Sequence, residues 1–198
     1  MGEVDDFWHK RHDLFNLIYL PILLGSNIYA LAYWTQPNLS IYLYVFITYM
    51  LLDSAWVLII PRCVASPSTI LFHHVATFFG LIATYLLDFD FAILGCVGGL
   101  VEVNTICLLA RRNFRDWHIF GYLFYISWVA TRLIMGPWLF YKALTLLWAK
   151  YSSLGFVEAT VAVGLVSIIT LLNILNIKWT WDLFSKQMKS KGEISKGL

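Results

Sequence analysis

Long apolar stretches recur along the chain and alternate with short polar breaks. The hydrocarbon core of a bilayer is about 30 Å thick, and a helix of about 20 apolar residues crosses it. The strands of a membrane β-barrel are shorter and alternate between apolar and polar residues, whereas these stretches are continuous. The pattern therefore predicts an all-α membrane protein with about six transmembrane helices, near residues 14–34, 39–60, 69–87, 91–110, 118–141 and 154–177.

The breaks between these stretches contain residues that end helices or form turns. A Gln-Pro-Asn break lies at 36–38, an acidic turn at 88–90 and a basic loop at 111–116. The segment 136–150 is open to two interpretations, because its Gly-Pro step either kinks one long helix or splits it in two. We expect an N-terminal segment (1–13), a transmembrane domain (14–184) and a basic tail (185–198).

The distribution of Lys and Arg predicts the orientation in the membrane. With six spans, both termini lie on one side, and cytosolic loops carry an excess of these residues. The side of the termini collects eleven: Lys10, Arg11, Arg62, Arg111, Arg112, Arg115, Lys178, Lys186, Lys189, Lys191 and Lys196. The other side has only Lys142 and Lys150. We therefore expect both termini in the cytosol.

The composition supports a membrane protein and excludes other classes. Hydrophobic residues make up 60% of the chain and charged residues only 13%, about half the share in soluble domains. The net charge of +2 argues against a nucleic-acid partner. The three cysteines, Cys63, Cys96 and Cys107, match no metal-binding spacing and are interpreted as small packing residues.

Several ionisable residues fall inside the predicted spans, where an unpaired charge is costly. Asp53, His73, His74 and Glu102 come from three different spans, yet each lies about 6–12 Å from the cytosolic ends. Arg132 lies deeper, about 20 Å from that side. Side chains at one depth on several helices predict a polar chamber open to the cytosol. Asn104, Tyr125 and Thr77 add polar groups near the same layer.

The histidines carry the candidate chemistry. A histidine in such a chamber can act as a general base or as a nucleophile, and a carboxylate can orient it. Simpler interpretations remain open, because the histidine pair can instead face lipid head groups, and Asp53 and Glu102 can pair with Arg132 to join helices. His9 and His12 precede the first predicted span, and we expect them to be solvated. Adjacent histidines on a helix point about 100° apart, which disfavours a metal site.

Four stretches, taken in order, resemble the TLC family, named for the TRAM, Lag and CLN proteins. They are Asp-Ser at 53–54, Leu-Phe-His-His-Val-Ala-Thr at 71–77, Glu-Val-Asn-Thr with Arg-Arg-Asn-Phe at 102–105 and 111–114, and the stretch 124–137. The resemblance covers essentially the whole membrane domain. It implies a barrel-like ring of six helices around a lipid-accessible chamber, in the endoplasmic reticulum or another endomembrane rather than the plasma membrane.

The resemblance also implies a chemistry. Ceramide synthases of this family transfer an acyl chain from acyl-CoA to a sphingoid amine, and their histidine pair corresponds to His73 and His74. Their longer motif contains a His-Asp step, whereas the matching stretch here, 87–94, has no histidine. The chain therefore looks more like the short TLC-domain-containing proteins, which are linked to phospholipid composition and membrane fluidity.

Two functional hypotheses follow. The first is acyl transfer from acyl-CoA to a lipid amine or hydroxyl through the histidine pair, with no other cofactor and no metal. The second is a non-catalytic lipid-binding protein that regulates membrane lipid composition. An ion transporter is the least favoured reading, because the acids lie on one side and form no path across. We expect catalytic roles for His73, His74, Glu102 and Asp53, and lipid-binding roles for Asn104, Arg132, Tyr125 and Thr77.

Overall fold

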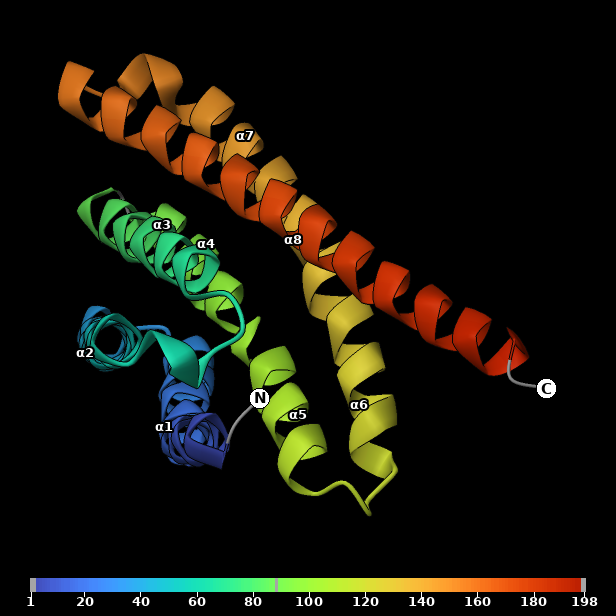
Figure 1. Cartoon of the computed structure of the whole chain (residues 1–198). Helices are drawn as coiled ribbons and strands as arrows, with labels where there is room; N and C mark the ends of the chain where they lie inside the picture. Colours follow the sequence, from blue (N-terminus) through green and yellow to red (C-terminus); the bar gives the residue numbers. More distant parts are fainter. Residues whose placement is uncertain (1–2, 88, 197–198) are drawn as a thin grey trace.

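The computed structural model of the protein describes residues 3–87 and 89–196 (Figure 1). All regular elements in these residues are helical: α1 (Glu3–Ala32), α2 (Gln36–Ile59), η1 (Pro61–Cys63), α3 (Pro67–Leu86), α4 (Phe89–Gly99), α5 (Glu102–Asn113), α6 (Ile119–Trp128), η2 (Val129–Met135), α7 (Gly136–Lys150), η3 (Tyr151–Ser153) and α8 (Phe156–Lys196). Asp88, in the predicted acidic turn, lies outside the described residues.

Six helical segments are long and apolar enough to cross a membrane, which confirms the predicted all-α transmembrane fold. They are Phe7–Ala32, Gln36–Ile59, Pro67–Leu86, Phe89–Asn113, Ile119–Ser153 and Phe156–Ser185. Below, they are called spans one to six.

Both ends of the described chain are more helical than the sequence indicated. Helix α1 begins at Glu3 rather than near residue 14, so most of the expected N-terminal segment belongs to the first helix. At the other end, α8 continues to Lys196, through most of the expected basic tail. The early start of α1 brings polar residues of the N-terminal segment into contact with the bundle.

The six spans form a ring whose order differs from their order in the sequence. Helix α1 packs against α2, α2 against α3 and α3 against α8 (Figure 1). Helix α8 packs against α7, α6 against α5, and α5 against α1, which closes the ring. Helix α4 contacts α1, α3 and α7, so it joins opposite sides of the ring.

Span four is broken where it contacts the first two helices. The amide of Leu100 donates to the carbonyl of Val97, three residues back, so the carbonyl of Cys96 lacks its usual helical donor. Asn27 Nδ2 of α1 donates to that carbonyl at 2.8 Å. Inside a membrane every backbone polar group needs a protein partner, and Asn27 meets this need. The break divides the predicted continuous span at 91–110 into α4 and α5, and α5 carries Glu102 and Asn104.

Span five is one long helix with an irregular middle. The π-helical segment η2 ends directly before Gly136 and Pro137. Proline has no amide hydrogen to donate to the preceding turn, and π-helical segments are a common way to accommodate such a defect. The segment 136–150 is therefore the second half of one helix, not a separate span. Arg132 lies in the π-helical segment.

Close packing of α4 against α1 and α2 depends on Gly99. A Cβ atom at this position would overlap the Tyr42 hydroxyl, and it would lie 3.0 Å from Asn27 Nδ2 and 3.2 Å from Phe46 Cε1. Small residues let membrane helices approach closely in this way. A Cβ atom at Gly164 on α8, in contrast, meets no atom within 4 Å.

We predict that Gly99→Ala destabilises the protein by about 1–3 kcal/mol, the usual cost of overpacking a filled contact. Thermal unfolding of the purified protein in detergent measures this effect. Gly164→Ala is the matched control and should leave the unfolding temperature unchanged or slightly higher. Equal unfolding temperatures for the two variants would contradict the packing described.

Candidate functional site

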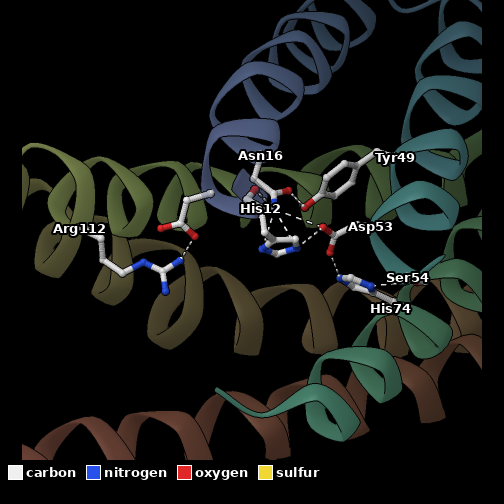
Figure 2. A network of polar contacts seen from close by, with 8 residues as sticks. His12, Asn16, Tyr49, Asp53, Ser54, His74 and Arg112 are labelled. Carbon is white, nitrogen blue, oxygen red and sulfur yellow. Dashed lines mark hydrogen bonds and ion pairs between the residues drawn. The ribbon is translucent and has the colours of Figure 1, made fainter. Parts of the chain in front are cut away.

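The carboxylate of Asp53 joins three transmembrane helices. Asp53 lies on α2 and is only 3% exposed. Its Oδ1 lies 2.7 Å from His12 Nε2 on α1, and its Oδ2 lies 3.4 Å from His74 Nε2 on α3 (Figure 2). Each carboxylate oxygen thus faces one imidazole. A buried charge is tolerated only when it is paired in this way.

Further polar groups complete the cluster around Asp53. Asn16 Nδ2 donates to Asp53 Oδ1 at 3.2 Å, and the Tyr49 hydroxyl donates to Asn16 Oδ1 at 2.9 Å. The Ser54 oxygen lies 3.0 Å from His74 Nδ1 (Figure 2). With its proton on Nε2, His74 would point this proton toward the Asp53 carboxylate, and Nδ1 would accept from the Ser54 hydroxyl. We call His12, Asn16, Tyr49, Asp53, Ser54 and His74 the Asp53 network.

His12 is the functional residue that the sequence reasoning missed. We expected a solvated side chain, but His12 is 6% exposed, so that prediction is wrong. The reason is the early start of α1, which carries the polar N-terminal residues along the bundle. A signal was present in the sequence, since His12 and Asn16 are four residues apart and share one face of a helix.

An ion pair fixes the same end of α1 to α5. Arg112 Nη2 lies 2.5 Å from Asp13 Oδ1 (Figure 2). Asn113 Nδ2 donates to Asp13 Oδ2 at 3.3 Å. Cys63 of η1 lies nearby in a fully buried position. Burial and the negative charges of Asp53 and Asp13 raise the pKa of the Cys63 thiol to about 11. Cys63 therefore stays neutral, as expected of a packing residue.

A cavity of about 100 Å³ lies inside the ring, between α3, α4, α8 and the second half of span five. His73 and Thr77 of α3 line it. His73 Nδ1 and Thr77 Oγ1 are buried and have no hydrogen-bond partner within the described structure. Buried polar atoms almost always have a partner, so two unpartnered atoms at one cavity indicate a place for a polar ligand group.

Arg132 also lines the cavity. Its Nε donates to Asn104 Oδ1 at 3.0 Å, and its Nη1 donates to Asn176 Oδ1 at 2.8 Å. The guanidinium lies 4.9 Å from the ring centres of both Trp128 and Trp179. Two amides and two indoles thus hold this cation in place.

The remaining predicted site residues lie at the edge of these two groups. Glu102 is buried on α5. Tyr125 does not line the cavity, and its hydroxyl accepts from Arg111 Nη1 at 3.4 Å. Among the described residues, Arg132 makes no direct ion pair with Asp53 or Glu102, which argues against the simple helix-joining pairs considered above.

The two histidines therefore face different surroundings. His74 belongs to the Asp53 network, whereas His73 faces the cavity and packs edge-on against Trp179. Their ring centres are 5.9 Å apart. No three His, Cys, Asp or Glu side chains of the described residues converge on a point that would hold a metal ion.

A family model of the TLC domain matches residues 14–185. The chain belongs to the TLC family. No curated protein sequence and no solved structure matches it. As a TLC protein with six membrane-crossing helices, it is an integral multi-pass membrane protein, and the family membership supports a lipid-related function. The matched region contains every residue of the Asp53 network except His12, which precedes it by two positions.

We predict that His12 and Asp53 are energetically coupled in this TLC protein. A double-mutant cycle with His12→Ala and Asp53→Asn should give a coupling energy of about 1–2 kcal/mol, because the two side chains share a buried charge-assisted hydrogen bond. Unfolding in mixed micelles measures the cycle. His9→Ala is the control, and its coupling to Asp53→Asn should be near zero. Equal coupling for His9 and His12 would contradict the network.

Proposed function

We propose that this protein transfers an acyl group from acyl-CoA to an amine or hydroxyl of a membrane lipid, with His73 as the nucleophile. The observation that carries the proposal is the unpartnered, buried Nδ1 of His73 at the cavity wall. In the tautomer that carries its proton on Nε2, this nitrogen has a lone pair that no hydrogen bond occupies. His74 is less suited to this role, because Ser54 and Asp53 occupy its two nitrogens.

The cavity lining suits an acyl chain. Apolar side chains of α7 and α8, including Leu139, Leu165 and Ile168, line it together with glycines of α4. Such a surface accepts the part of a hydrocarbon chain nearest its carbonyl without loss of hydrogen bonds, and a cavity of about 100 Å³ holds no more of the chain than this. The polar groups of the lining, His73, Thr77 and Arg132, mark where the carbonyl end of the chain belongs.

The chemistry divides into two balanced steps. First, His73 attacks the thioester carbonyl, the bond to sulfur breaks, and the thiolate of CoA leaves with the electron pair. The CoA thiolate takes the remaining ring proton, which leaves a neutral acyl-imidazole and free CoA thiol. Second, the amine or hydroxyl of the lipid attacks this acyl group and its proton passes to a base. The bond to His73 then breaks, and the base returns the proton to the departing ring nitrogen, which regenerates neutral His73. Covalent catalysis of this kind replaces one difficult step by two easier ones.

Arg132 and the Asp53 network supply the supporting roles. A fixed guanidinium at the cavity wall stabilises the negative oxygen that develops in each step, and its amide partners hold it in place. His74 acts as the base through Ser54, whose hydroxyl lies 3.0 Å from His74 Nδ1 and passes on the proton of the acceptor, and Asp53 stabilises the resulting imidazolium. Asn104 acts through Arg132, whereas Thr77 faces the cavity directly.

The expected membrane is the endoplasmic reticulum or another endomembrane, with both termini in the cytosol, where acyl-CoA is available. The excess of Lys and Arg on the side of the termini supports this orientation. The partners in this proposal are membrane lipids and acyl-CoA.

We predict that exposure to a long-chain acyl-CoA increases the intact mass of the purified protein by one acyl group. His73→Ala should abolish the increase, because the attacking nitrogen is lost, and His9→Ala should preserve it. An unchanged mass of the native protein, together with a lipid carried through purification, would overturn the acyl-transfer proposal. That result would favour a non-catalytic lipid-binding role.

We also predict a smaller, distinct effect for Asp53→Asn. Loss of the carboxylate removes the group that stabilises protonated His74, so turnover should fall by about 10²-fold. The single-turnover mass increase at His73 should persist, because the attacking residue remains. A steady-state assay of the acylated lipid, combined with intact mass spectrometry, separates these effects. Full turnover in this variant would contradict the assigned role.

A further inference from the structure

A second pocket, of about 500 Å³, lies at the opposite end of α5 from Glu102. It is lined by the last turn of α5, the loop to α6 and the first turn of α6. Its residues are Leu108, Arg111, Arg112, Arg115, Trp117, His118 and Gly121. We call it the basic pocket. The loop lies between spans four and five, so the basic pocket is open to water at the membrane boundary.

The basic pocket carries an excess of positive charge. Three arginines line the basic pocket, and no carboxylate lines it. The nearby Asp13 pairs with Arg112 but is not part of the lining, and Asp116 is exposed in the loop. Arg115 makes no ion pair within the described part of the chain, and Arg112 remains 44% exposed despite its pair with Asp13. Arginine binds phosphate through two parallel hydrogen bonds, which a lysine cannot do.

Aromatic packing gives the pocket a rigid, flat wall. The Trp117 ring is 64% exposed and stacks on Phe120 at 5.9 Å, with 10° between the ring planes. The guanidinium of Arg111 lies 5.2 Å from the ring centres of both Phe124 and Tyr125. The Trp117 indole, which Phe120 holds in place, lies beside several guanidinium groups. This combination suits a ligand that has both a planar base and phosphates.

We propose that the basic pocket binds the phosphate groups of a nucleotide, with the base stacked on Trp117. The nucleotide part of CoA belongs to this class, and its assignment as the natural ligand rests on the proposed function. Arg112 lies eight residues beyond Asn104 on α5, about 12 Å along the helix. An arm that extends about 12 Å along α5 from the basic pocket would reach the level of Asn104, which holds Arg132. An anionic lipid head group offers the same phosphate chemistry from the membrane.

The experiment is isothermal titration of free CoA into the full-length protein in an uncharged detergent, with pantetheine, which lacks the nucleotide, as the comparison ligand. CoA should bind and pantetheine should not. Arg115→Gln should weaken CoA binding about tenfold or more, the loss expected for one charge-assisted contact to phosphate. Trp117→Ala should weaken it as well. Arg62→Gln removes an exposed arginine from the same side of the membrane and should change nothing.

Two further experiments distinguish a failure of the nucleotide proposal from a failure of the acyl-transfer proposal. His73→Ala should bind CoA as the native protein does, so nucleotide binding and acyl transfer are tested independently. Mass spectrometry of lipids bound to the protein in nanodiscs tests the other phosphate source, an anionic lipid. If the native protein retains such a lipid, Arg115→Gln loses it and CoA does not bind, the basic pocket is a phosphate site. That result would overturn its assignment to a nucleotide. Absence of both CoA binding and Arg115-dependent lipid retention would overturn the proposal.

Discussion

The structure depends on keeping the negative charge of Asp53 inside the bundle. A buried carboxylate is costly unless nearby groups donate hydrogen bonds to it. Here the hydrogen-bond partners are His12 and Asn16 on α1, and the His74 imidazole on α3 lies 3.4 Å away, so pairing this one charge fixes the positions of three spans. His74 contacts Asp53, and the neighbouring His73 lines the cavity instead.

The structure divides between two places the polar residues that the sequence predicted to lie at one depth in the membrane. The predicted chamber residues divide between the Asp53 network, centred on α1, α2 and α3, and the cavity lined by α3, α4, α8 and span five. The histidine pair joins them, since adjacent residues on one helix point in directions about 100° apart. In the proposed mechanism, one imidazole carries the acyl group while the other accepts the proton.

The spans were predictable because helix length and apolar composition are local properties, whereas their irregularities were not. The break at residues 100–101 depends on Asn27 and Tyr42 reaching backbone carbonyls of α4, at Cys96 and Gly95 respectively, contacts that hydropathy does not encode. His12 was missed for a related reason, because a polar N-terminal segment looks solvated until its partner is known. Helix geometry makes His73 and His74 point in different directions, but which of them meets Asp53 and which meets the cavity follows from tertiary packing.

The most direct test of this account is tandem mass spectrometry that locates the acyl group after brief exposure to acyl-CoA. The account predicts an acyl group on His73, because this imidazole faces the cavity and His74 is held by Asp53 and Ser54. An acyl group on His74 or on the Ser54 hydroxyl would contradict it, since either result would make the Asp53 network the reactive centre and His73 part of the cavity wall.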